Sequence, residues 1–550
     1  MTSNPLDDPF YYLNNFMQVL DWLDQRYADV LSDEEQAFIR HFYQLPRESR
    51  ALLVRMVMRK GVHFRASKLH YLEIGDIAQA AAPLLELGWL DEQAPLLLET
   101  LFEVLLKAEI VECFGNVIAQ PKGKKSDWLP ALSPHFLQAQ PFGQWCAPLQ
   151  DRLFSLTIMG LCDRLRLMFF GNLYQDWSEF VLADLGIFTY EKVEFCAESR
   201  GLRSRDDVDA CLFLHQCQQA FEAGVEVPDV VAQINGLALA NPWLEKRRAK
   251  LLFQIGQHCE RVADFAHALA IYRDCAWPGA RGRMIRVLER CGEYPLAMEL
   301  AMLAEQAPQS ASEHQQLLRV IPRLRRKLGG PPNKRPAPRP MQRLDLQLPR
   351  VDPALSVEFY VQAHLAQASA PVHYVENSLI NSLFGLLCWP AIFAPLPGAF
   401  FHPFQRGPVD LHNEDFHARR AHLFEACLAE LDDGRYRQTI RERYVAKWNV
   451  QSPFVFWGAL TEELLDLALE CLPAEHLRHW FSRLLLDIKA NRAGMPDLIQ
   501  FWPQDKTYRM IEVKGPGDRL QDNQLRWIEF CHEHQMPIAV CYVQWAEQSA

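Results

Sequence analysis

Two carboxylates and one lysine near the C-terminal end of the chain have residue types and a spacing suited to phosphoester hydrolysis. Asp497 follows Pro496, and Glu512 and Lys514 come fifteen and seventeen residues later, on either side of Val513. Residues two apart on a strand point to the same face, so Glu512 and Lys514 would share a face. A carboxylate and an ammonium group side by side, with a second carboxylate on the neighbouring strand, suit a metal ion and an attacking water.

The charges predict a role for each of these residues. We expect Asp497 and Glu512 to hold one or two Mg²⁺ or Mn²⁺ ions, with the Val513 carbonyl as a further ligand, because hard divalent cations prefer oxygen. Lys514 would orient or deprotonate the attacking water and stabilise the pentavalent state as a fixed cation. The alternative is an ordinary surface hairpin, in which Lys514 pairs with Glu512 and contributes little to stability.

The surrounding sequence predicts the elements that would position these side chains. Two short strands joined by a polar turn at 504–506 are expected first, and a Gly-Pro turn follows them. An amphipathic helix over 519–535 and a strand over 538–543 complete the order strand, strand, helix, strand. With its P-D and E-V-K motifs, this order resembles the small α/β core of the PD-(D/E)XK nuclease superfamily.

Most of the remaining chain has helical periodicity, so the predicted fold class is α+β with several domains. Residues 96–132 contain a helical run, a loop rich in proline, glycine and lysine, and a second helix, an arrangement that resembles a SAP module. Lys122, Lys124 and Lys125 of this loop are the expected contacts to the backbone of duplex DNA, and a solvated loop is the alternative. Five regions are predicted: a helical N-terminal domain over 1–70, the SAP-like region over 71–149, a tetratricopeptide-like helical array over 150–324, a Pro/Arg-rich linker over 325–350 and the nuclease core over 351–550.

Composition narrows the class of protein. The formal net charge of −11 argues against a generally basic nucleic-acid binder but allows local basic surfaces. The 14 cysteines include no C-x-x-C pair, which favours a reducing cytoplasm over zinc ribbons or a disulfide framework. The N-terminal residues lack the order of a signal peptide, and the apolar stretch 382–401 contains three prolines. We therefore expect 382–401 to form a buried helix and a loop, with no membrane partner.

Longer motifs narrow the resemblance to one family. The stretch "NRAGMPDLIQFW…YRMIEVKGPGDRLQDNQLRWI" is similar to the virus-type replication–repair (VRR-NUC) branch, and the whole chain resembles bacterial Fanconi-associated nucleases. "VENSLINSLFGLLCW" and "FQRGPVDL" extend the similarity upstream. The resemblance implies that Glu376 is a catalytic metal ligand and Gln405 an active-site residue, and that Gln524 supports the site. The zinc-finger spacing with which animal members bind ubiquitin does not occur in the sequence.

The resemblance also implies a substrate and an activity. The expected enzyme is a metal-dependent DNA phosphodiesterase that cuts near 5′ flaps and trims DNA 5′→3′ during interstrand-crosslink repair. It would act as a monomer on branched DNA, in the cytoplasm at the nucleoid. Lys489 falls where the family binds a 5′-terminal phosphate, and Arg281 and Arg283 on the helical array are candidates for the same pocket, because a terminal phosphate accepts several charge-assisted hydrogen bonds.

Two other functions remain open from the sequence alone. A Holliday-junction resolvase would need two active sites in symmetric opposition, which the long helical N-terminal region would obstruct. A helical-repeat scaffold with an inactive nuclease fold would be free to lose Asp497, Glu512 or Lys514, yet all three are present.

Overall fold

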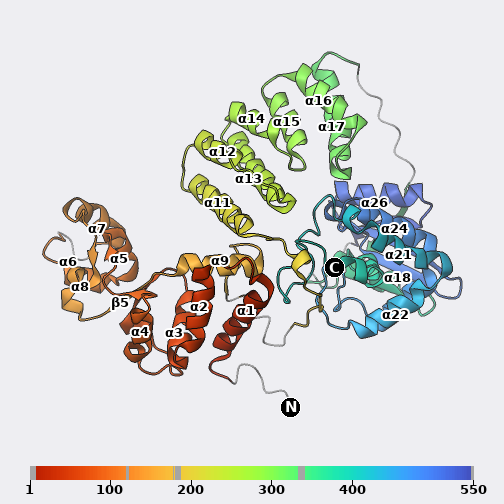
Figure 1. Ribbon diagram of the computed structural model, residues 1–550. Helices are drawn as coiled ribbons and strands as arrows, with labels where there is room; N and C mark the ends of the chain where they lie inside the picture. Colours follow the sequence, from red (N-terminus) through yellow and green to blue (C-terminus); the bar gives the residue numbers. More distant parts are fainter. Residues whose placement is uncertain are drawn as a thin grey trace. The chain divides into compact units, whose positions relative to one another are not determined.

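The computed structural model describes residues 8–118, 123–177, 179, 188–331, 341–352 and 354–546 (Figure 1). The chain divides into two compact units, Met1–Phe188 with Phe195–Leu212, and Thr189–Glu194 with Phe213–Ala550. Asp497, Glu512 and Lys514 all lie in the second unit.

The N-terminal unit is built from helices and a few short strands. Strands β1, β5 and β2 form an antiparallel sheet in that order, and β3 pairs with β4. A separate apolar core that includes Leu101, Phe114, Trp128 and Trp145 holds α5 to α8 together. The elements are α1 (Tyr11–Tyr27), α2 (Asp33–Gln44), α3 (Arg47–Val57), β1 (His63–Arg65), α4 (Ile77–Glu86), β2 (Leu90–Asp91), β3 (Pro95–Leu96), α5 (Leu98–Val104), α6 (Lys107–Phe114), α7 (Lys125–Leu132), β4 (Gln140–Pro141), α8 (Phe142–Trp145), β5 (Leu153–Leu156) and α9 (Met159–Phe170).

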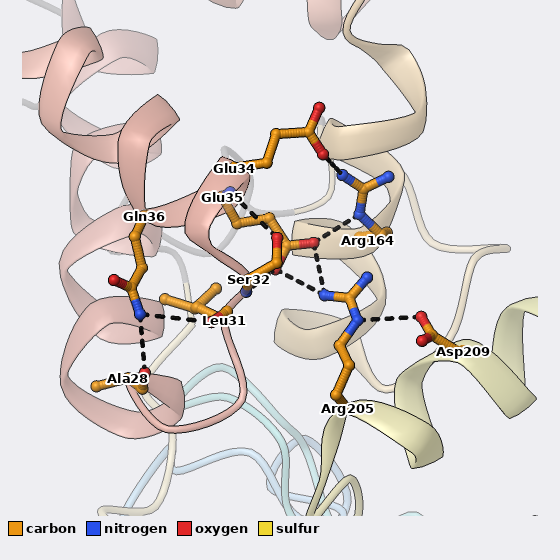
Figure 2. Close-up of polar contacts among 9 residues, drawn as sticks. All are labelled: Ala28, Leu31, Ser32, Glu34, Glu35, Gln36, Arg164, Arg205 and Asp209. Atoms are coloured by element: carbon orange, nitrogen blue, oxygen red, sulfur yellow. Dashed lines mark hydrogen bonds and ion pairs between the residues drawn. The ribbon is translucent and has the colours of Figure 1, made fainter.

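A buried carboxylate connects three helices of this unit (Figure 2). Glu35, in the first turn of α2, accepts hydrogen bonds from Arg164 Nε of α9 at 2.6 Å and from Arg205 Nη1 at the start of α11 (Arg205–Glu222) at 2.9 Å. The Ser32 N–H also donates to Glu35 and completes the capping box of α2. Burial by itself would raise the pKa of Glu35, but these donors outweigh burial, so this pKa lies below its ordinary value. The carboxylate therefore stays charged and fixes the junction of α2, α9 and α11.

The C-terminal unit begins with the helical array that the sequence predicts. Helices α13 to α17 each pack on the next in sequence, as in repeat proteins. Small residues allow close crossings: a Cβ at Gly256 of α13 would lie 2.7 Å from the Tyr272 ring of α14. On α16, Ala297, Ala301 and Ala304 are fully buried. After α11 come α12 (Val227–Asn235), α13 (Pro242–Arg261), α14 (Phe265–Asp274), α15 (Ala280–Arg290), α16 (Tyr294–Gln306) and α17 (Ala311–Lys327).

The nuclease core is a five-stranded mixed sheet in the order β6-β10-β9-β8-β7. The central strand β9 is antiparallel to β8 and parallel to β10. The core contains these five strands and the helices α18 to α26. They are β6 (Gln342–Leu348), α18 (Val357–Leu365), β7 (Val372–Tyr374), α19 (Leu379–Leu387), α20 (Trp389–Ile392), α21 (Ala421–Asp433), α22 (Tyr436–Ala446), α23 (Glu462–Cys471), α24 (Ala474–Leu486), α25 (Ile488–Asn491), β8 (Leu498–Trp502), β9 (Thr507–Lys514), α26 (Asp522–Glu533) and β10 (Ile538–Trp545).

The predicted order strand, strand, helix, strand is confirmed by β8, β9, α26 and β10. Two further strands, which were not predicted from the sequence, complete the sheet. Residues 342–348, assigned to the linker 325–350, form β6, and 372–374 form β7 inside the stretch expected to be helical. At the other end of the linker, α17 continues to Lys327. The error has a physical cause, because β6 pairs in parallel with β10, which lies far away in sequence, and local patterns do not report such pairings.

Most of the apolar stretch 382–401 is buried in the protein, as predicted, although its three prolines are exposed. All residues of α19 are buried, and Gly385 lets α19 approach the segment at Phe454, because a Cβ there would lie 2.7 Å from the Phe454 Cβ. Of the helices that the structure describes, none is long and apolar enough to cross a membrane.

Candidate active site

The β8–β9 hairpin brings Asp497, Glu512 and Lys514 together at one end. Asp497 directly precedes β8, and its Oδ2 accepts a hydrogen bond from the Val513 N–H of β9 at 2.7 Å. Lys514 Nζ lies 2.8 Å from Glu512 Oε1. The exposed fractions of Asp497, Glu512 and Lys514 are 7%, 1% and 7%. These are buried charges, which rules out the ordinary surface hairpin.

Burial and crowding raise the pKa of both carboxyl groups. For Asp497, burial is the largest cause, and the charges of Glu376 and Glu358 add to it, so the pKa rises to about 6. For Glu512, burial and the charge of Asp497 raise the pKa to about 8, although Lys514 acts in the opposite direction. The site therefore concentrates acidic groups that a cation would stabilise in the charged form.

Glu376 lies at this end of the hairpin, as the family resemblance implies, and its charge acts on Asp497 and Glu512. Its carboxylate is exposed and accepts hydrogen bonds from Tyr374 Oη and, at 3.2 Å, from Asn377 Nδ2. The pKa of Tyr374 is raised, first by burial and then by this bond to Glu376. Three carboxylates from separate stretches of the chain thus act on one another here.

Sequence reasoning missed a fourth carboxylate, that of Glu358 in the first turn of α18. Its charge raises the pKa of both Asp497 and Tyr374. Helix α18 packs beside β9, since a Cβ built on Gly515 would lie 3.8 Å from Val357 Cγ1. The local signal was weak, because an acidic residue after a Ser N-cap is common at any helix start.

The donor set fits a divalent cation. Within the described part of the chain, no three His, Cys, Asp or Glu side chains converge at metal-binding distances. Glu512 Oε1, however, is buried and makes no hydrogen bond of good geometry to a described residue, although Lys514 Nζ is close. A buried carboxylate oxygen next to further carboxylates is the environment in which hard cations bind oxygen.

The structure places two of the expected residues in local turns. Gln405 Oε1 accepts hydrogen bonds from the N–H groups of Phe401 and His402, so this oxygen holds its own loop. Gln524 Oε1 accepts a hydrogen bond from the Gln521 N–H at 2.9 Å and caps the start of α26. Both amide oxygens therefore bind backbone N–H groups nearby in the sequence, and the roles of Gln405 and Gln524 stay predictions.

The candidate phosphate-binding residues occupy two places. Lys489 is exposed on α25, whereas Arg281 and Arg283 lie on α15. The two arginines bind different buried carboxylates, Arg281 that of Glu313 at 2.6 Å and Arg283 that of Glu260 at 3.3 Å. Among the described residues, no hydrogen bond or ion pair joins Lys489 to either arginine.

Two residues of the loop between α20 and α21, His412 and Glu414, interact electrostatically with charged groups at these two places. The pKa of Glu414 is raised by burial first and then by Asp487, two residues before Lys489, and by Glu313, the partner of Arg281. In the same loop, burial and then the charges of Arg492 and Lys489 lower the pKa of His412. Sequence reasoning did not identify Glu414 or His412, since neither belongs to a recognisable motif.

The lysines of the SAP-like region belong to the N-terminal unit. Lys122 lies outside the described residues. Lys124 precedes α7, where its N–H donates to Asp127 at 3.1 Å, and Lys125 Nζ donates to the Leu105 carbonyl at 2.9 Å. Helix α6 precedes this stretch and α7 begins at Lys125, so Lys125 lies on a helix and not in the loop where it was predicted.

The mixed sheet, with carboxylates and a lysine buried at the open end of its central hairpin, defines a nuclease core of the PD-(D/E)XK type. Three family models match the chain. They are described as "FAN1, HTH domain", which matches residues 10–91, "Fanconi anemia-associated nuclease SAP domain", which matches 95–145, and "VRR-NUC domain", which matches 431–545.

Similarity to known proteins extends over nearly the whole chain. A Fanconi-associated nuclease 1 homolog of Pseudomonas aeruginosa is 56% identical over 545 residues, which cover 99% of this chain and 98% of the relative. The Arabidopsis thaliana homolog is 23% identical, over 97% of this chain and 67% of its own length. The crystal structure of paFAN1 bound to 2nt 5′flap DNA with gap matches with a TM-score of 0.89 and 56% identity, over 98% of this chain and 99% of that one.

The chain belongs to the Fanconi-associated nuclease family and is a DNA-cleaving enzyme. The predicted family, fold class and nuclease activity are confirmed. An inactive scaffold is correspondingly disfavoured, because the acidic groups and the lysine are buried together at the site that defines the class.

Proposed function

We propose that this nuclease cuts DNA near 5′ flaps, trims it 5′→3′ and acts in interstrand-crosslink repair, in the cytoplasm at the nucleoid. The observation that carries the proposal is the buried group of Asp497, Glu512 and Lys514 on a chain 56% identical to a protein crystallised with 5′ flap DNA. Contacts of the helical array and the SAP-like region to phosphates, including those of Lys124 and Lys125, would hold the duplex arms. Selectivity would then follow from the shape of a flap junction.

In this proposal Asp497, Glu512 and Glu376, with the Val513 carbonyl, hold Mg²⁺ or Mn²⁺. When bound, such a cation lowers the pKa of water and neutralises charge on the scissile phosphate. Lys514 Nζ lies on the same face as Glu512, where it orients the attacking water as an ammonium group or takes a proton from it as a neutral amine. Gln405 contributes through its loop, since its carbonyl oxygen is bound to the backbone.

A substrate panel tests the proposal. Labelled 5′-flap, 3′-flap, Holliday-junction and single-stranded DNA are incubated with EDTA, Mg²⁺, Mn²⁺ or Ca²⁺. We expect 5′-flap cleavage with Mg²⁺ or Mn²⁺, none with EDTA, and binding without turnover with Ca²⁺, whose larger coordination shell activates water poorly. Equal cleavage of 3′ and 5′ flaps would contradict the flap assignment, and symmetric cuts in the Holliday junction would favour the resolvase.

The finer proposal is that Lys489, with Arg281 or Arg283, binds a 5′-terminal phosphate and sets the distance to the cut. Its support is that Lys489 is exposed on α25, eight residues before Asp497, at the position where the family resemblance implies a phosphate-binding residue. A terminal phosphate carries nearly two negative charges and can accept several charge-assisted bonds.

This pocket predicts a preference that Lys489→Ala removes. The parent should cut one-nucleotide 5′-phosphorylated flaps faster than 5′-hydroxyl flaps, and Lys489→Ala should cut both at similar rates. Lys506→Gly is the control, because Lys506 is exposed at the far turn of the hairpin and its φ of 50° accepts glycine. Equal cleavage of both ends by the parent, or an unchanged preference in Lys489→Ala, would contradict the pocket and leave the nuclease assignment intact.

A further inference from the structure

Two segments that carry proposed metal ligands stay joined beyond the last residues of their strands. The β7–β8 ladder ends where Tyr374 pairs with Leu498, yet segments 375–381 and 492–497 remain connected. The connecting bonds are Val375 N–H to the Asp497 carbonyl at 2.8 Å, Met495 N–H to Asn377 Oδ1 at 3.0 Å and Asn381 Nδ2 to the Arg492 carbonyl at 2.9 Å. Glu376 lies on the first segment and Asp497 on the second. These bonds therefore help to fix the distance between the two carboxylates.

Asn377 is the residue through which both carboxylates are connected. Its Nδ2 donates to Glu376 Oε1 at 3.2 Å, while its Oδ1 accepts the Met495 N–H, two residues before Asp497. Its backbone has a φ of 50°, in the left-handed region that asparagine tolerates better than other residues with a side chain. The Asn377 carbonyl also accepts a hydrogen bond from Asn381 Nδ2 at 2.7 Å. One amide side chain therefore binds the carboxylate of Glu376 and the backbone next to Asp497.

We propose that Asn377 is a positioning residue, which holds the Glu376 carboxylate at a fixed place relative to Asp497 and so preorganises the cation site. The proposal rests on the assignment of the carboxylate site to cation binding. Without the amide, the Glu376 carboxylate keeps only its hydrogen bond from Tyr374 Oη, and the 492–497 segment loses one of its three bonds. Partners of metal ligands typically change metal affinity or activity by about 10–100-fold, although they never touch the metal.

The test compares Asn377→Gly with Asn449→Gly. Glycine keeps the left-handed backbone and removes only the amide, and Asn449 is a matched control with a φ of 62°. We expect Asn377→Gly to bind Mn²⁺ about tenfold more weakly, measured by electron paramagnetic resonance of free Mn²⁺ without DNA. The turnover number on flap DNA should fall by a similar factor and recover in part at high Mn²⁺, with KM for DNA changed less than about twofold.

A structural role alone would lower the melting temperature of Asn377→Gly without changing Mn²⁺ affinity, and that result would overturn the proposal. The same conclusion follows if its Mn²⁺ affinity and turnover stay within about twofold of Asn449→Gly. If Asn377→Gly fails to fold, Asn377→Asp is used in its place. Aspartate keeps the acceptor for the Met495 N–H but cannot donate to Glu376. A turnover number of Asn377→Asp equal to that of the parent would overturn the proposal. If the parent does not cleave flap DNA, the flap assignment fails, whereas the Mn²⁺ comparison still tests Asn377.

Discussion

Replacing Asp497 with alanine is expected to abolish DNA cleavage while leaving binding of flap DNA nearly unchanged. A metal ion contributes several kcal/mol of transition-state stabilisation, so the loss of one of its ligands should slow cleavage about 10³-fold or more. Glu512→Ala should have the same effect. Because each substitution also removes negative charge from a crowded site, affinity for the DNA backbone should be maintained or slightly increased. Single-turnover cleavage and binding in Ca²⁺ measure the two quantities separately.

Two further variants separate chemistry from structure. Asp497 Oδ2 accepts the Val513 N–H, so alanine also leaves a buried donor without a partner, whereas Asp497→Asn keeps an acceptor there. Asp497→Asn should therefore fold like the parent and still fail to cleave. Asp505→Ala, at the exposed far turn of the hairpin, is the control and should cleave normally. Cleavage by Asp497→Ala within about tenfold of the parent would refute its role as a metal ligand.

Lys514→Ala should lower the cleavage rate by about 10²-fold or more, with little change in DNA binding. The lysine has two functions in the structure, since its ammonium group lies beside Glu512 and lowers the pKa of that carboxyl against the effect of burial. Without Lys514 the Glu512 pKa should rise further, so that the remaining activity shifts to higher pH. A rate–pH profile of the parent and Lys514→Ala measures this shift.

Lys514→Arg distinguishes charge from proton transfer. Arginine keeps the positive charge, but its guanidinium group does not lose a proton in proteins, so it should rescue cleavage poorly if Lys514 deprotonates water. Full activity of Lys514→Arg would limit the role of this residue to charge.

Local sequence patterns were sufficient to predict the catalytic hairpin. The alternation of Glu512, Val513 and Lys514, together with the polar turn at 504–506, is a local pattern, and strand periodicity fixes which side chains share a face. Helix α26 and strand β10 followed from the same kind of local signal. Glu376 was found through the family resemblance, because a glutamate after a short strand has no periodicity to mark it.

The groups that act on this hairpin from distant parts of the chain could be identified only from the packed fold. Strand β6 pairs with β10 from the opposite end of the core, the Glu358 charge acts on Asp497 from α18, and Asn377 binds the segment before β8. It also showed that Arg281 and Arg283 are held by Glu313 and Glu260 of neighbouring helices. Periodicity reports only interactions between residues a few positions apart, whereas this buried site depends on pairings between residues more than a hundred positions apart. Burial also sets the pKa values of Asp497 and Glu512, and it arises only when the sheet and the helices around it pack together.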